Sequence, residues 1–348
     1  MPTPMPMPRS SRLTAALAAL LLAPAVAAPA QETPATKVGV KLERKGDEIV
    51  VAGQFFHTTA PVVLWTDPGG YDAYRVERRF VPLDQAGWDA TQKAGGIESP
   101  NRYSLRRRGL TPEQVERVRG GGWDLDTLRN VVDQFVIHYD VCGTSKRCFQ
   151  VLHDARGLSV HFMLDVDGTI YQTLDLKERA WHATVANDRS VGIEIANMGA
   201  YPNNAKADDS PLAKWYARSQ DGHTRLTIPG GVESSGIRDR SRPLAPARDE
   251  PVVGTIQGQE LRQYDLTPQQ YDSLVKLTAT LCTVFPKIKC DYPRDDAGKP
   301  VSKKLPDDQL NRYQGVLGHY HVQTNKTDPG PAFQWDTVIG GAKKLMGN

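Results

Sequence analysis

Short runs of β-favouring apolar residues end at polar side chains, and this pattern most restricts the folds that the chain can adopt. Phe135-Val136-Ile137 ends at His138. Val191-Gly192-Ile193-Glu194-Ile195 alternates, which places both isoleucines on one face of a strand and Glu194 on the other. In an open α/β sheet, functional side chains usually lie at the ends of such strands. The two runs therefore predict buried strands that present His138 and Glu194 to a site.

Further strand and helix signals surround these two runs. Residues 160–164 and 169–174 flank the turn Asp165-Val166-Asp167-Gly168, which predicts a β-hairpin. Thr267-Pro268-Gln269-Gln270 is a capping box before apolar residues at helical spacing up to Leu281. Strand and helix signals in this order predict an α/β domain.

The first 27 residues have the features of a secretory signal peptide. Arg9 and Arg12 precede an apolar run over residues 13–23, and small residues follow at 25–27. We therefore expect an exported protein, periplasmic or extracellular. The later sequence has no apolar run of about 18 residues, so we expect no transmembrane segment after the signal is removed.

Composition, together with the distribution of turn- and loop-forming residues, indicates the rest of the domain organisation. A net charge of +3 over 348 residues gives no support to nucleic-acid binding. We expect a leader and a small β-containing N-terminal region of unknown role over residues 28–124, and the α/β domain over 125–345. Residues 201–258 are rich in Pro, Gly, Asp, Arg and Ser, which predicts a long insertion within that domain.

Export also affects the interpretation of the four cysteines. Outside the cytosol, cysteines at short separations usually oxidise. We predict two local disulfides, Cys142–Cys148 and Cys282–Cys290, while the sequence leaves the two other connectivities open.

Two histidines and one aspartate form a candidate metal site. His138 ends one strand, His319 follows the apolar run 316–318, and Asp328 lies in the turn Thr327-Asp328-Pro329-Gly330. Two imidazoles and a carboxylate suit Zn²⁺ and leave a fourth position for water, as hydrolysis requires. Glu194 is the candidate general base.

Two other ligand assignments are open at this stage. If residues 319–321 are extended, His319 and His321 point the same way and form an H-x-H pair, which would leave Asp328 without a role. Cys142, four residues after His138, is an alternative thiolate ligand, although a disulfide with Cys148 is favoured.

Five motifs in this order resemble the zinc-dependent N-acetylmuramoyl-L-alanine amidases of the type-2 amidase family, whose fold peptidoglycan-recognition proteins share. The motifs are Val136-Ile137-His138, Ala180-Trp181-His182-Ala183, Val191-Gly192-Ile193-Glu194, Gly318-His319 and Lys326-Thr327-Asp328-Pro329-Gly330-Pro331. The resemblance covers about residues 125–345 and implies a central mixed β-sheet flanked by helices.

The resemblance also implies roles for individual residues. His138, His319 and Asp328 would bind zinc, and Glu194 would activate water. Lys326 would stabilise the oxyanion. His182 is expected to line the substrate groove. Independently of the resemblance, His161 is either a packing or surface residue or, from its position on the first strand of the predicted hairpin, faces the same groove, where we place it.

The implied reaction is hydrolysis of the amide between the lactyl group of N-acetylmuramic acid and L-alanine, in peptidoglycan or in released muropeptides. A non-catalytic peptidoglycan-binding protein on the same fold is one alternative, although all three metal ligands are present. A zinc peptidase acting on the stem peptide is another, although the H-E-x-x-H motif is absent.

Overall fold

The structure is a computed structural model, and it describes residues 1, 3, 38–203 and 211–347. The chain divides into two compact units, Met1–Glu43 and Arg44–Asn348. The predicted signal peptide over residues 1–27 lies outside the described residues apart from positions 1 and 3. Within the described ranges, no helix combines the length and the apolar character needed to cross a membrane.

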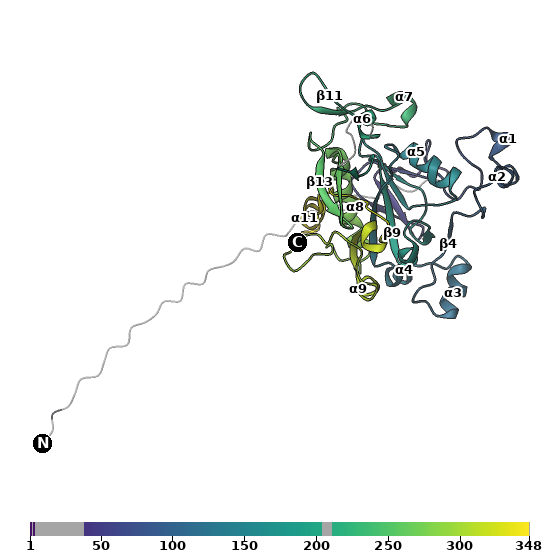
Figure 1. Ribbon diagram of the computed structural model, residues 1–348. Coiled ribbons are helices and arrows are strands. Elements are labelled where there is room, and N and C mark those ends of the chain that lie inside the picture. The colour runs from purple at the N-terminus through teal and green to yellow at the C-terminus, as the bar shows by residue number, and fades with distance from the viewer. Residues whose placement is uncertain (2, 4–37, 204–210, 348) are drawn as a thin grey trace, which may run out of the picture. The chain divides into compact units, whose positions relative to one another are not determined.

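The second unit contains a six-stranded mixed sheet with the order β15-β5-β9-β6-β7-β3. Figure 1 labels β9 of this sheet. β15, β5, β9 and β6 are parallel, β7 is antiparallel to β6, and β3 is parallel to β7. This arrangement confirms the predicted α/β class, the hairpin and both predicted strands. The strands are β3 (Val62–Leu64), β5 (Gln134–Tyr139), β6 (Phe162–Leu164), β7 (Ile170–Gln172), β9 (Ser190–Ile195) and β15 (Gly315–Gly318).

Four smaller sheets and a set of helices surround this sheet. The smaller sheets are formed by β1 (Glu48–Val51) with β2 (Gln54–His57), β4 (Tyr103–Leu105) with β8 (Glu178–Ala180), β11 (Tyr216–Arg218) with β12 (Thr224–Leu226), and β10 (Tyr201–Pro202) with β14 (Gln259–Gln263) and β13 (Val252–Ile256). The helices are α1 (Leu83–Ala86), α2 (Trp88–Ala94), α3 (Pro112–Arg119), α4 (Leu125–Val131), α5 (Ser145–Phe149), the π-helix η1 (Gln150–Ala155), the 3₁₀-helix η2 (Thr184–Ala186), α6 (Pro211–Trp215), α7 (Val232–Ser235), α8 (Pro268–Val284), α9 (Asp307–Arg312), α10 (His319–Val322) and α11 (Trp335–Leu345).

Alternation along the strands gives the sheet two apolar faces. Ile137 of β5 and Ile193 of β9 belong to a buried cluster with α8 and α11. Met163 of β6 belongs to a second cluster with α5 and η1 on the other face. His138 and Glu194 each follow a residue of the first face, so they lie on the second face, as the alternation predicts.

Residues 44–124 of the N-terminal region are part of the same compact unit as the α/β domain. β3 forms the edge strand of the central sheet, and β4 pairs with β8. Arg106, which follows β4, has no exposed surface. α3 begins at the capping box of Thr111, where the Thr-Pro-Glu-Gln sequence places a helix start. Residues 44–124 therefore complete the α/β unit rather than forming a separate one.

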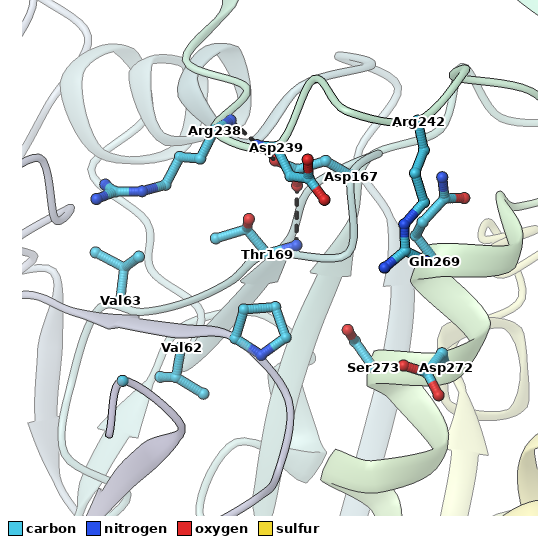
Figure 2. Close-up of a pocket in the computed structure, with 12 residues that line it drawn as sticks. Val62, Val63, Asp167, Thr169, Arg238, Asp239, Arg242, Gln269, Asp272 and Ser273 are labelled. Carbon is cyan, nitrogen blue, oxygen red and sulfur yellow. Dashed lines mark hydrogen bonds between the residues drawn. The ribbon is translucent and has the colours of Figure 1, made fainter. Parts of the chain in front are cut away.

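The insertion predicted over residues 201–258 is folded where the structure describes it, and contains β10, α6, β11, β12, α7 and β13. Figure 2 shows where this segment meets the turn between β6 and β7. The carboxylate of Asp167 accepts the backbone N–H groups of Thr169, Arg238 and Asp239, each at 2.8 Å. These residues border a cavity of 490 Å³ beside β3 whose lining holds no histidine or cysteine. The cavity therefore differs from the predicted site.

Candidate metal centre and reaction cavity

The three predicted metal ligands lie together at the carboxyl ends of two neighbouring strands. His138 is near the end of β5 and His319 follows β15 directly, and these strands pair in parallel with Gly318 opposite Ile137. Asp328 reaches the same point from the turn that follows α10. His138 Nδ1, His319 Nδ1 and Asp328 Oδ2 are each 2.9 Å from the other two. Only 1%, 5% and 7% of these residues is exposed, respectively.

Hydrogen bonds behind the cluster leave the two Nδ1 atoms without hydrogens. His319 Nε2 lies 2.7 Å from Gln323 Oε1, which accepts only, so Nε2 carries the hydrogen. His138 Nε2 lies 3.0 Å from His182 Nδ1, and His182 Nε2 lies 3.3 Å from the hydroxyl of Ser190. This chain is satisfied when His138 donates to His182 and His182 donates to Ser190.

The donor set therefore fits a metal ion. Two bare imidazole nitrogens and a carboxylate oxygen point their lone pairs at one another, an arrangement that needs a cation between them. A tetrahedral zinc with bonds of about 2.0 Å keeps its ligand atoms about 3.3 Å apart, close to the separations found here. Among the described residues, His138, His319 and Asp328 form one of the groups whose ligand atoms lie close enough together to hold a metal ion.

The protonation states agree with this interpretation. Burial, together with the neighbouring His319, lowers the pKa of His138 to about 4, so this imidazole is neutral at physiological pH. Burial alone would raise the pKa of Asp328, but the two histidines outweigh it and hold that pKa below its ordinary value. Neutral histidines and an ionised aspartate are the forms that bind metals.

Glu194 is next to this cluster and has a free oxygen. It pairs in register with His138 across β5 and β9. Its Oε2 is buried and has no hydrogen-bond partner among the described residues. Burial, followed by the negative charge of Asp328, raises the pKa of Glu194, while Lys326 lowers it. An unpartnered carboxylate oxygen beside a metal cluster is available to accept a proton from water.

A cavity of 290 Å³ opens onto these groups. It is lined by the end of β5, by η1 and by the loop before α11, and its lining includes Trp181, Glu194, His319, Lys326 and Asp328. The predicted oxyanion-stabilising lysine and the predicted base therefore border the same space. This space is large enough for the reacting part of a substrate rather than for a whole one.

His182 lines the cavity wall, and its Nδ1 also lies 3.0 Å from His138 Nε2, behind the cluster. Its ring lies against Gly192, where an added Cβ would be 2.5 Å from two ring atoms. The glycine in Val191-Gly192-Ile193-Glu194 therefore makes room for His182. This supporting role was not predicted from the sequence.

His161 does not line the cavity, in contrast to the prediction. It has no exposed surface, so it has no contact with a substrate. Its Nδ1 accepts the N–H of Gly192 at 3.1 Å, and its Nε2 lies 3.0 Å from both the carbonyl of Glu178 and the guanidinium of Arg106. His161 thus supports β9 from behind.

The H-x-H alternative is wrong because residues 319–322 form the helix α10 rather than an extended segment. His321 is thereby turned away from His319. Its Nδ1 accepts the N–H of Gly318 at 2.9 Å, and its Nε2 donates to the carbonyl of Val301 at 2.7 Å. Both ring nitrogens are occupied, so Asp328 keeps its place in the cluster.

The four cysteines are free thiols in the structure, so neither disulfide is formed there. The predicted partners are nevertheless close enough to affect each other: burial and then Cys142 raise the pKa of Cys148, and Cys290 raises the pKa of Cys282. Cys142 is not part of the metal-ligand group.

Asp140 orders the loop that holds Cys142, and sequence reasoning missed it. Its Oδ1 accepts the N–H groups of Cys142, Gly143 and Asn197.

A buried His-His-Asp cluster beside an unpartnered carboxylate is typical of metal-assisted hydrolases. The family model described as N-acetylmuramoyl-L-alanine amidase, Amidase_2, matches residues 128–331, which is more than half of the chain. The chain therefore belongs to this family of peptidoglycan amidases. A comparison with curated proteins gave no match.

Three solved structures illustrate what the chain is similar to. A selenomethionine derivative of AmpD is 17% identical, with 70% of this chain and 92% of that chain covered and a TM-score of 0.31. The amidase AmiD from E. coli, in complex with anhydro-N-acetylmuramic acid-L-Ala-D-gamma-Glu-L-Lys, is 17% identical, with 69% and 65% covered and a TM-score of 0.32. The amidase LysC from Clostridium intestinale URNW is 15% identical, with 63% and 87% covered and a TM-score of 0.30.

Proposed function

We propose that the chain is an exported zinc amidase that hydrolyses the amide between the lactyl group of N-acetylmuramic acid and L-alanine. The observation that carries the proposal is the convergence of three lone pairs, from His138, His319 and Asp328, at mutual distances of 2.9 Å beside the free oxygen of Glu194. The substrate class is a muramoyl peptide, of the kind with which AmiD was crystallised.

Each residue of the proposed site has a separate role in the hydrolysis. When bound, Zn²⁺ polarises the scissile carbonyl and lowers the pKa of water. Glu194 accepts a proton from the attacking water and returns it to the leaving nitrogen of L-alanine. Lys326 places a positive charge at the cavity, where the carbonyl oxygen gains negative charge. His182 and Gln323 hold the two histidines in the tautomers that leave their Nδ1 atoms free.

Metal analysis and product analysis test this proposal together. The purified mature protein should hold one zinc per chain, and His138→Ala and His319→Ala should lose it. His223→Ala is a matched control, because His223 is exposed, contacts Asp249, and neither residue lines the cavity. Mass spectrometry of digested muropeptides should find peptides with a free N-terminal L-alanine. Zinc retained in either ligand variant would overturn the assignment of the site, and cleavage within the peptide would support a peptidase instead.

Export is tested separately. Cell fractionation of the full-length chain should find it outside the cytoplasm, with an N-terminus near residue 28. An intact N-terminus in the cytoplasmic fraction would contradict the predicted signal peptide.

A further inference from the structure

Two cysteine thiols border the reaction cavity and have no role in the proposed hydrolysis. The 290 Å³ cavity is lined by Cys142 and Cys148 as well as by Glu194. Cys142 lies in the loop that follows β5, and Cys148 lies on α5. The other two cysteines, Cys282 and Cys290, lie outside the described lining of this cavity. The first pair is therefore placed where a change of its chemical state can affect catalysis.

The two thiols are close to each other and to the candidate base. Burial, followed by the neighbouring Cys142, raises the pKa of Cys148, and the carboxylate of Glu194 raises it further. Burial, followed by nearby groups that include Cys142, raises the pKa of Glu194. Charge effects of this kind weaken with distance, so the three side chains surround one part of the cavity. Cys142 is 7% exposed and Cys148 is 2% exposed, so Cys142 is the more accessible thiol.

The loop that carries Cys142 has a strained backbone. Val141 has a φ of 52°, in the left-handed region that a β-branched residue disfavours. Such a conformation persists only where the surroundings hold it in place. Here the Asp140 carboxylate accepts the N–H of Cys142 at 2.8 Å and that of Gly143 at 3.0 Å. Since Val141 also lines the cavity, relaxation of this loop would move the cavity wall, and a covalent bond from Cys142 to α5 would oppose that movement.

We propose that Cys142 and Cys148 form a redox-sensitive site, whose oxidation to a disulfide fixes the cavity wall beside Glu194 and raises the rate of hydrolysis. The inference rests on the proposed function. The oxidant is a small-molecule disulfide of the glutathione class. The Cys142 thiolate attacks it and releases one thiol, which leaves a mixed disulfide on Cys142. Cys148 then loses its proton, attacks the Cys142 sulfur and releases the second thiol, so two electrons pass from the cysteines to the oxidant.

Trapping of the mixed disulfide tests the order of these steps. Treated with glutathione disulfide, the wild-type protein should form the Cys142–Cys148 bond and keep no glutathione. Cys148→Ser should keep glutathione on Cys142, because no second thiol displaces it, whereas Cys142→Ser should stay unmodified at Cys148. Mass spectrometry of the digested proteins distinguishes these products. A Cys142 thiol that stays unmodified in Cys148→Ser would overturn the proposal.

Kinetics of the zinc-loaded full protein test the effect on hydrolysis. One sample is oxidised with glutathione disulfide, and the other is reduced with a phosphine that is then removed. At equal zinc content, the oxidised sample should have a kcat about 3- to 30-fold higher on N-acetylmuramoyl-L-Ala-D-γ-Glu-L-Lys. The variant Cys142→Ser/Cys148→Ser should lose this difference, and the control Cys282→Ser/Cys290→Ser should keep it. Equal rates in the wild type, or a difference that persists without Cys142 and Cys148, would overturn the proposal.

Hydrogen exchange separates the redox site from the proposed function. The N–H groups of Cys142 and Gly143, which Asp140 accepts, should exchange more slowly in the oxidised wild type than in the reduced wild type. The variant Cys142→Ser/Cys148→Ser should show no such dependence. If neither redox form hydrolyses the substrate but exchange still depends on the redox state, the proposed function fails while the redox site holds. Equal exchange in the two wild-type samples would overturn the redox site itself.

Discussion

The hydrogen bond between Gln323 and His319 makes a specific prediction about metal affinity. Gln323 Oε1 accepts from His319 Nε2 at 2.7 Å and so keeps Nδ1 bare for the metal. In Gln323→Leu this acceptor is lost. The other tautomer then becomes favourable, because a hydrogen on Nδ1 can donate to Asp328 Oδ2, 2.9 Å away. Two of the three ligand atoms would then be paired with each other, and a metal has to displace that bond.

Loss of such a supporting hydrogen bond typically costs about 10- to 100-fold in metal affinity, or about 1.4 to 2.7 kcal/mol. We expect the zinc Kd of Gln323→Leu, measured by competition with a chromophoric chelator, to rise by this factor. α10 should stay intact, because Gln257 holds the backbone carbonyls of Tyr320 and Gln323 independently of the side chain.

Two controls make the result decisive. Gln323→Glu keeps an acceptor at the same place and should keep the wild-type affinity, whereas Gln92→Leu changes an exposed glutamine on α2 and should have no effect. The reasoning is refuted if Gln323→Leu binds zinc as tightly as the wild type, or if Gln323→Glu loses as much affinity as the leucine variant.

Three further predictions concern catalysis, acid stability and oxidation. Glu194→Gln should keep its fold and zinc but lose about 10² to 10⁴ in kcat, because an amide does not accept the proton; near wild-type kcat would remove Glu194 from the mechanism. Burial alone raises the pKa of Glu48, but three backbone N–H groups and Arg44 outweigh it and lower this pKa from 4.5 to about 2. Since a depressed pKa stabilises the fold above the unfolded value, about 3 kcal/mol of stability should fade as the pH falls from about 5 to 2, and acid titration of Glu48→Gln should lack that loss. Peptide mapping of protein recovered from outside the cytoplasm should find a Cys142–Cys148 disulfide that contributes about 2 kcal/mol to the free energy of unfolding, and free thiols there would contradict the prediction.

The three residues of the His-His-Asp cluster could be singled out from the sequence because each lies where a local pattern ends. A β-type run predicts the end of β5 at His138, and the turn residues around Asp328 predict a tight turn. Gln323 was missed for a physical reason. Its contact with His319 is an i, i+4 pair on a helix, whereas the H-x-H alternative considered an extended segment there. One short helical turn changes which side chains share a face.

Buried polar groups with distant partners were beyond local patterns. Asp140 binds three backbone N–H groups from two segments, and nothing in its immediate sequence indicates the second segment. His161 was placed in the groove because its strand is near the site. The burial of His161 depends on its contact with Arg106, which lies 55 residues earlier in the chain. Periodicity does not report such pairings, since they are made only when the chain folds.

Arg106 also explains why the N-terminal region belongs to the site. Its guanidinium is fully buried and donates to the carbonyls of Leu176, Asn187, Asp188 and Ser190. Burial lowers its pKa to about 10, so it stays charged at neutral pH, and the carbonyls supply the acceptors that a buried cation requires. Ser190 begins β9, and the Arg106 guanidinium also faces His161, which accepts the N–H of Gly192 on the same strand. The strand that carries Glu194 is therefore fixed from behind by a residue outside the family match. A domain boundary at the start of that match would cut this support, so the architecture of the site extends back at least to β4.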